Sequence, residues 1–222
     1  MRIHTADFVA GAASARGVAI VIDVFRACSL YAHALAAGAE TIIPVEGIDE
    51  AQGLKAQHPQ RLLVGERHER RLPGFDCGNS RSEVLAVKPA GRGVIHTTHT
   101  SAQDLMSASR VVSYVFTGAF VTMSATIAAV RALAPEGVTI VAMGHEARER
   151  YEDDDLCREA MIAALEGHSF PLANLPYGLK GMPAAAKFFD PQADWAPESD
   201  FDLCTHFDAV PFEISLIPGS MG

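Results

Sequence analysis

The sequence predicts an α/β fold, in which helices cover both faces of a sheet. Short apolar runs that are rich in β-branched residues alternate along the chain with segments that carry helix-capping residues. The 222 residues are 49% hydrophobic, which fits one globular domain or two small domains packed closely together.

The first predicted strand, residues 18–24, is a continuous apolar run that ends beside an acid, as expected for a strand buried on both faces. The helix predicted over residues 29–37 has Ser29 as its N-cap and Gly38 after its end. A strand over 41–45, a helix over 49–57 and a short strand over 62–64 follow.

The alternation then repeats, with strands predicted over 93–98, 111–115 and 138–142 and helices over 101–108, 124–133 and 154–165. Residues 21–45 and 94–116 both run through a strand, a polar turn, a helix and a strand. An internal βαβ duplication would explain this likeness, but any two βαβ units look alike, and we favour the second explanation.

From about residue 168 the alternation fades, and prolines punctuate the remainder of the chain. We therefore predict a single α/β domain over residues 1–222, with residues 168–222 as a less regular extension packed against it.

The net charge of −9 argues against a nucleic-acid surface, which needs clustered Lys and Arg, although local arginines can still bind a small anion. No apolar run approaches the ~18 residues that span a bilayer, and the first residues lack the apolar core of a signal peptide. The cysteines are widely spaced and form no C-x-x-C pair. We expect a cytoplasmic protein without nucleic-acid or membrane partners, and the apolar content is compatible with a homodimer.

Residues 65–80 form the loop that points most directly to function, because acids, arginines and glycines crowd together after a strand. The glycines and Asn79 give the backbone unusual freedom beside Glu66 and Asp76, which could hold a cation. A solvated surface loop is the alternative.

Polar turns follow the strongest strands, at the sheet edge where α/β proteins bind ligands. Helix N-termini in these turns suit phosphate or sulfonate, and arginines can add bidentate contacts. The hydroxyl groups could complete an anion cradle, although each alone is more simply a helix cap. The candidate anion ligands in these turns are Arg26, Ser29, Thr97, Thr98, Thr100 and Arg148.

Acids beside the strand ends suggest a divalent metal. Asp23 ends a buried strand, where an acid must be paired, with Arg26 for example, or hold a cation. The acidic run 152–155 follows another buried strand, and either Mg²⁺ or solvent at a helix start can relieve its repulsion. Cys28 stands at a helix start that lowers a thiol pKa, so it is a candidate nucleophile, with an inert cysteine as the alternative.

Taken in order, the segments VIDVFRACSLYAHALAAGAETIIPV, GERHERRLPGFDCGNS, VIHTTHTSAQDL, EDDDLC and DFDLCTHFDAVP resemble 2-phosphosulfolactate phosphatases of the ComB type over nearly the whole chain. The resemblance implies a three-layer α/β/α fold with a mostly buried mixed sheet. It also implies a Mg²⁺-dependent phosphatase that converts (2R)-phospho-3-sulfolactate to sulfolactate and phosphate, a step toward coenzyme M.

On this hypothesis Mg²⁺ binds among Asp23, Glu66, Asp76 and Asp154, and the residues alone do not choose the set. Arginines stabilise the phosphoryl oxygens, with Arg26, Arg67 and Arg148 as the candidates and Asn79 beside them. The nucleophile is water, with a carboxylate such as Glu66 as general base, or Cys28; we favour water.

The chain departs from the family pattern at His99, Ala147 and Arg158, close to the predicted ligand turns. A non-catalytic, anion-binding member of the family is therefore one alternative function. The other is an isochorismatase-like cysteine hydrolase, because residues 18–25 are similar to the first strand of those enzymes, although no lysine stands at a matching strand end and Cys157 follows acids rather than a glycine-threonine turn.

Overall fold

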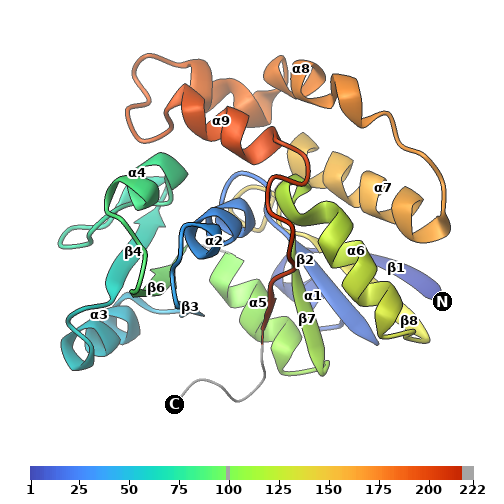
Figure 1. Cartoon of the computed structure of the whole chain (residues 1–222), viewed down its shortest axis with the longest axis horizontal. Helices are drawn as coiled ribbons and strands as arrows, with labels where there is room; N and C mark the ends of the chain where they lie inside the picture. Colours follow the sequence, from blue (N-terminus) through green and yellow to red (C-terminus); the bar gives the residue numbers. More distant parts are fainter. Residues whose placement is uncertain (99–100, 217–222) are drawn as a thin grey trace.

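The computed structural model describes residues 1–98 and 101–216, and its described strands form two sheets flanked by helices (Figure 1). The first sheet has the strand order β1 (Arg2–Asp7), β8 (Gly137–Ala142), β2 (Val18–Ile22), β7 (Tyr114–Gly118) and β9 (Ser215–Leu216). The second has the order β3 (Thr41–Pro44), β6 (Gly93–Thr97), β4 (Leu62–Arg67) and β5 (Arg70–Arg71). Within each sheet the pairs are parallel, except that β9 and β5 run antiparallel to their neighbours. The predicted α/β class with mixed sheets is confirmed.

The helices lie between and around the sheets. The α-helices are α1 (Phe8–Ala12), α2 (Ala27–Ala36), α3 (Ile48–Gln57), α4 (Arg81–Ala86), α5 (Ser101–Ser109), α6 (Met123–Ala132), α7 (Glu152–Glu166), α8 (Leu175–Lys180) and α9 (Glu198–Thr205). Short 3₁₀ helices are η1 (Phe120–Thr122), η2 (Leu172–Asn174) and η3 (Pro183–Phe189). No helix in the described part of the chain has both the length and the apolar character needed to span a membrane.

Alternating side chains along the strands create the layers. In β2, Ile20 packs into the core formed with α6 and α7, whereas Val21 packs on α2 and α5. In β4, Val64 joins the α2–α5 core from the second sheet, and Leu63 packs on α3. Helices α2 and α5 are therefore covered by a sheet on each side, as Figure 1 shows near its centre.

The two similar stretches of sequence cross between the sheets. The first runs from β2 through α2 to β3, and the second from β6 through α5 to β7. Each stretch thus has the predicted strand–helix–strand order, but its two strands belong to different sheets. A local sequence pattern does not specify which sheet the second strand joins, because that depends on packing with distant segments.

Some predicted boundaries were wrong. Helix α2 begins at Ala27, so Ser29 is not its N-cap; the Ser29 hydroxyl instead donates to the Val24 carbonyl oxygen. Helix α7 begins at Glu152, which places the acidic run in its first turn. Strand β7 begins at Tyr114 rather than 111, because Val111 continues the turn that ends α5.

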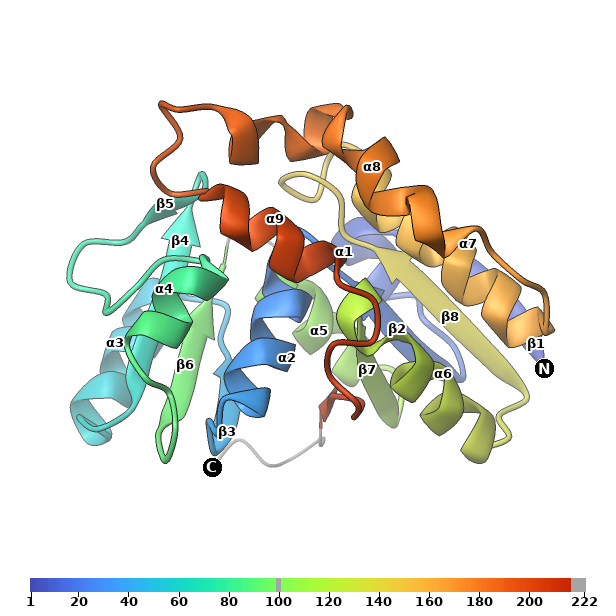
Figure 2. The ribbon, with the colours of Figure 1, turned by 45° about the horizontal axis from the view of Figure 1, so that its top comes forward.

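The C-terminal residues are more regular than predicted. Helices α8, η3 and α9 place Leu179, Phe188 and Phe201 in the same apolar core as β2 and β8. Figure 2 shows this orange-to-red segment arching over the carboxyl ends of β4 and β8. The sequence lacked long periodic runs here, because each element is short and buries only a few side chains.

Candidate functional site

A cavity of about 60 Å³ lies where strand ends from both sheets meet. Asp23 follows β2 and Gly144 follows β8 in the first sheet, while Glu66 lies near the end of β4 in the second. This is the edge at which α/β sheets usually bind ligands. The cavity brings together the predicted site residues Asp23, Arg26, Glu66, Asn79 and Asp154.

Two adjacent acids from the first turn of α7 form the inner wall. Asp154 accepts hydrogen bonds from Val24 N at 2.9 Å and Gly144 N at 2.8 Å, so it ties the turns after β2 and β8 together. Asp153 accepts one from Phe25 N at 3.1 Å through Oδ2, and its buried Oδ1 has no hydrogen-bond partner in the described structure. The first turn of α7 therefore places two buried carboxyl groups at the cavity, one of which has an oxygen without a hydrogen-bond partner in the described structure.

Burial and mutual repulsion make these acids hold protons more strongly than usual. Burial raises the pKa of Asp153 to about 7, with Lys187 opposing the rise and Asp23 adding to it. Burial, followed by the charges of Asp153 and Asp23, raises the pKa of Asp154 well above its ordinary value. A cation in this cavity would relieve the repulsion.

Asp23 and Glu66 are held by backbone donors at the same cavity. Asp23 Oδ1 accepts from Ala27 N at 3.1 Å, in the first turn of α2. Glu66 Oε2 accepts from Glu69 N at 2.7 Å, which folds the β4–β5 connection over the strand end. Both side chains are buried, so their carboxylates are fixed before any ligand arrives.

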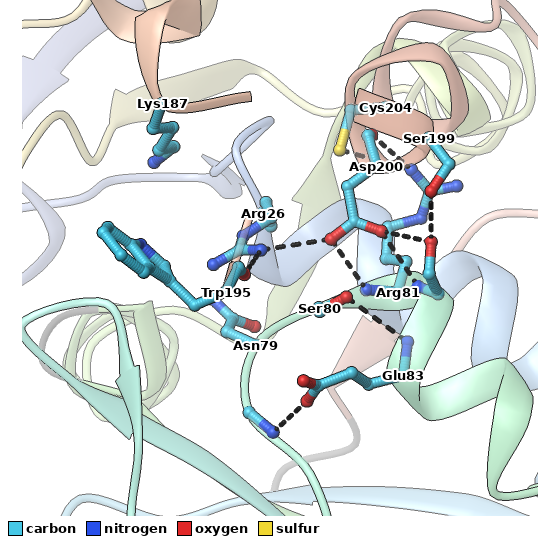
Figure 3. Close-up of polar contacts among 12 residues, drawn as sticks. Arg26, Asn79, Ser80, Arg81, Glu83, Lys187, Trp195, Ser199, Asp200 and Cys204 are labelled. Atoms are coloured by element: carbon cyan, nitrogen blue, oxygen red, sulfur yellow. Dashed lines mark hydrogen bonds and ion pairs between the residues drawn. The ribbon is translucent and has the colours of Figure 1, made fainter. Parts of the chain in front are cut away.

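Arg26 is the buried guanidinium of the site, and only 2% of it is exposed. Its NH1 lies 3.1 Å from Asp200 Oδ2 in α9 and donates to the Trp195 carbonyl oxygen at 2.7 Å. Figure 3 shows that Asp200 also reaches the start of α4, where it accepts from Arg81 N and Ser82 N. The C-terminal segment therefore fixes the orientation of Arg26.

Asn79 is positioned by a cap and by a buried histidine. Ser80 is the N-cap of α4 and its Oγ accepts from Glu83 N at 3.3 Å, while the Glu83 carboxylate accepts from Gly78 N at 2.8 Å (Figure 3). Asn79 Oδ1 lies 3.1 Å from His96 Nε2. The turn before α4 is therefore rigid where it lines the cavity.

Arg67 and Thr97 lie behind the cavity rather than along its lining. Arg67 donates to the Glu66 carbonyl oxygen at 2.7 Å and to Thr97 Oγ1 at 3.0 Å. Burial lowers the pKa of Arg67, although nearby Glu66 opposes this. In this structure both residues support the backbone that carries Glu66.

The remaining predicted site residues lie away from the cavity lining. Asp76 accepts from Leu63 N at 2.7 Å and pairs with Lys55 at 3.0 Å, so it fastens its own loop to β4 and α3. Thr98 accepts from Ala102 N at the start of α5, Ser29 lies within α2, and Arg148 is exposed. Thr100, like His99, lies outside the described residues.

The cysteines are poor nucleophiles in this structure. Cys28 is buried and donates to the Val21 carbonyl oxygen at 3.4 Å, and burial, then Asp23 and Asp154, raise its pKa well above normal. Cys157 is buried in the apolar core, with its pKa also raised by burial. Neither thiol lines the cavity.

Sequence reasoning missed several residues that line the cavity or hold its lining residues in place. Asp153 belonged to the recognised acidic run, but the helix was predicted to begin only at Asp154, so Asp153 was not singled out from the run as a cavity residue. Lys187, in η3, and Asp200, in α9, come from the stretch that gave no periodic signal. Of the departures from the family pattern, Arg158 pairs with Asp7 and Asp155, which is a structural role.

The donor atoms suit Mg²⁺, although they are not gathered into a ready-made site. Among residues 1–98 and 101–216, no group of three or more His, Cys, Asp or Glu side chains is arranged to hold a metal ion. The cavity is nevertheless lined by carboxylates, and Asp153 Oδ1 there lacks a partner. Mg²⁺ prefers oxygen ligands and often keeps several waters while taking only one or two carboxylates.

The chain is similar to a family of phosphatases. Residues 3–182 match the family model described as 2-phosphosulpholactate phosphatase. A probable 2-phosphosulfolactate phosphatase of Pseudothermotoga lettingae is 34% identical over 152 residues, which cover 68% of this chain and 64% of the relative. The similarly named protein of Thermosynechococcus vestitus is 35% identical over 153 residues, which cover 67% and 61%. That of Carboxydothermus hydrogenoformans is 44% identical over 89 residues, which cover 40% and 37%. Each match spans less than two thirds of the relative's length.

Proposed function

The chain belongs to the 2-phosphosulpholactate phosphatase family, and from this premise we propose that it is a Mg²⁺-dependent phosphomonoester hydrolase. The proposed substrate is 2-phosphosulfolactate or a related hydroxy-acid phosphate, and the products are the hydroxy acid and phosphate. The relatives' names support the reaction class. Cytoplasmic location, a homodimer and a role in coenzyme M synthesis stay predictions.

One observation carries the proposal: buried carboxylates and a buried guanidinium share a single cavity at the strand ends. Asp23, Glu66 and Asp153 contribute carboxyl groups, while Arg26 supplies fixed positive charge. A purely anion-binding pocket gains nothing from so many acids, because they repel the ligand. A site that also takes a divalent cation does gain, since the cation offsets both the acids and the phosphate.

The residues best placed to hold Mg²⁺ are Asp23, Asp153, Asp154 and Glu66. When bound, Mg²⁺ would neutralise phosphate charge and lower the pKa of a bound water. Asp76, which the sequence also suggested, supports the loop instead.

The protein's own groups would orient the ester and stabilise charge. Arg26 is preorganised by Asp200, so its guanidinium is available to the phosphoryl oxygens without reorganisation. Asn79 offers a neutral hydrogen-bonding side chain beside it. A cavity carboxylate would take the proton of the attacking water, and this assignment is supported by the burial of Cys28 away from the lining.

Phosphate release in the presence of Mg²⁺ tests the proposal, with a panel of hydroxy-acid phosphates as substrates. Asp23→Asn is expected to lower kcat/KM at least about 100-fold, because it removes a charge from the cavity while keeping the side-chain shape. Asp49→Asn, on the exposed start of α3, is the matched control and should retain activity.

Chelation should abolish turnover, and added Mg²⁺ should restore it. Tight binding of the panel without hydrolysis by the folded, Mg²⁺-supplied protein would contradict the phosphatase and favour the non-catalytic alternative. Full activity after chelation would contradict the metal requirement alone.

A further inference from the structure

Lys187 is the cavity-lining cation contributed by the C-terminal segment. Of the described lining residues, it is the one that comes after residue 182, where the family match ends. Its helix η3 is anchored in the main core through Phe188, the next residue. The position of Lys187 is therefore set by packing and is not that of a loose surface side chain.

The segment around Lys187 is fastened to the connection between β4 and β5. Lys187 Nζ lies 2.5 Å from Glu69 Oε1, and its side chain is only 14% exposed. The Arg70 guanidinium stacks 3.2 Å from the centre of the Trp195 ring and pairs with Asp194 at 3.0 Å. These contacts hold the ammonium group at the wall of the cavity.

The side chains of Arg26 and Lys187, which both line the cavity, differ in how firmly their contacts hold them. Arg26 uses NH1 for both Asp200 and the Trp195 carbonyl oxygen, so it is locked in place. Lys187 has three donors on a rotatable ammonium, and Glu69 accepts one of them. Figure 3 shows the Lys187 side chain extending from the C-terminal segment toward Arg26 and Trp195.

The electrostatic reach of Lys187 extends from the wall to the inner acids. Burial is the largest influence on the pKa of Glu69 and raises it, but Lys187, Arg26 and Trp195 together outweigh burial, so the pKa is lowered overall. Lys187, Glu69 and Asp153 line the same cavity. A ligand that lies between Glu69 and Asp153 therefore lies within the field of this ammonium group.

We propose that Lys187 is a specificity-determining residue, which binds the second anionic group of a substrate that carries a carboxylate or sulfonate close to its phosphoester. The inference rests on the proposed phosphatase function and adds to it the residue that recognises the second negative charge of the substrate. Arg26, fixed by Asp200, binds the phosphoryl group, and Lys187 binds the anionic group beside it. An ammonium group suits this task because it can keep its hydrogen bond to Glu69 while its other N–H groups donate to a compact anion.

The test compares two esters with Lys187→Met and Lys187→Arg. One ester is a 2-phospho hydroxy acid, and the other is the phosphate of an uncharged alcohol of similar size. Lys187→Met should raise KM for the hydroxy-acid phosphate about 10- to 100-fold, the effect of losing a charged hydrogen bond, with kcat changed much less. KM for the uncharged alcohol's phosphate should stay within about twofold, and Lys187→Arg should recover part of the loss.

Lys180→Met is the matched control, because Lys180 in α8 also makes an ion pair, with Glu198, but lies outside the cavity lining. It should leave both KM values unchanged. An equal rise in KM for both esters with Lys187→Met, or no rise for either, would overturn the role of Lys187 while the phosphatase stands.

If the wild-type protein hydrolyses neither ester, the phosphatase proposal fails, and calorimetric binding of the same two esters still decides the role of Lys187. Weaker binding of the hydroxy-acid phosphate alone in Lys187→Met would support it. Equal binding of the two esters by the wild type, or binding of neither, would overturn it.

Discussion

At the scale of the residue, Asp200 links the site to the C-terminal segment. It has 0% exposure, yet it receives donors from Arg26 and from the backbone of Arg81 and Ser82. A buried carboxylate with this many donors fixes the groups around it. Asp200 is therefore a positioning residue, which acts on the substrate through Arg26.

The replacement Asp200→Asn should lower kcat/KM about 10- to 100-fold, because Arg26 loses the charge that orients it. The free energy of unfolding should also fall, by about 3–5 kcal/mol as for other broken buried pairs. In an Arg26→Ala background the same replacement should have no further effect on kcat/KM. Asp202→Asn, on the exposed side of α9, is the control. A full additive loss in the double variant would show that Asp200 does not act through Arg26.

At the scale of the element, β6 carries a buried histidine that joins parts of the second sheet to the site. His96 Nδ1 lies 2.8 Å from the Tyr31 hydroxyl in α2, and Nε2 lies 3.1 Å from Asn79 Oδ1. Burial, and then the charge of Arg67, lowers the pKa of His96 to about 3. The folded protein therefore keeps this imidazole neutral over the range in which an unfolded chain would protonate it.

Acid should therefore weaken the fold through His96. The unfolded chain takes up this proton near pH 6.5 and the folded chain only near pH 3, so stability is lost as pH falls between these values. The contribution is at most roughly 1.4 kcal/mol per pH unit. Urea unfolding between pH 7 and 5 should show a shallower pH dependence in His96→Gln than in the wild type. The exposed His168→Gln is the control, and parallel curves for wild type and His96→Gln would refute the assignment.

At the scale of the whole molecule, α2 and α5 connect the two sheets through one apolar core. Leu30 of α2 and Leu105 of α5 are fully buried in the cluster that includes β2 and β4. Neither sheet can bury its inner face without these helices, so we expect the sheets to unfold together, as in a single domain.

Leu30→Ala should lower the free energy of unfolding by about 2–5 kcal/mol, because it leaves a cavity between the sheets. Calorimetry should show one transition that shifts as a unit to lower temperature. Leu133→Ala, at the partly exposed end of α6, should have a much smaller effect. Two separate transitions, of which only one moves, would mean that the sheets are independent units.

The sequence predicted those parts whose signal is local. The apolar runs of β2 and β8 and the acids near strand ends pointed to Asp23, Glu66 and Asp154, which line one cavity, and also to Asp76, which does not. The division into two sheets was not predictable, because identical strand–helix–strand patterns fit both arrangements. Lys187 and Asp200 were missed because their importance arises from contacts with Glu69 and Arg26, more than 100 residues away in the chain.

The dependence of Arg26 on Asp200 has a consequence for biosynthesis. A nascent chain that has left the ribosome only as far as residue 182 already contains the cavity carboxylates, but it has neither Lys187 nor Asp200. Such a chain has Arg26 but not the carboxylate that orients it. The order of translation thus delays the completed pocket until residues 183–205 have been made and have docked.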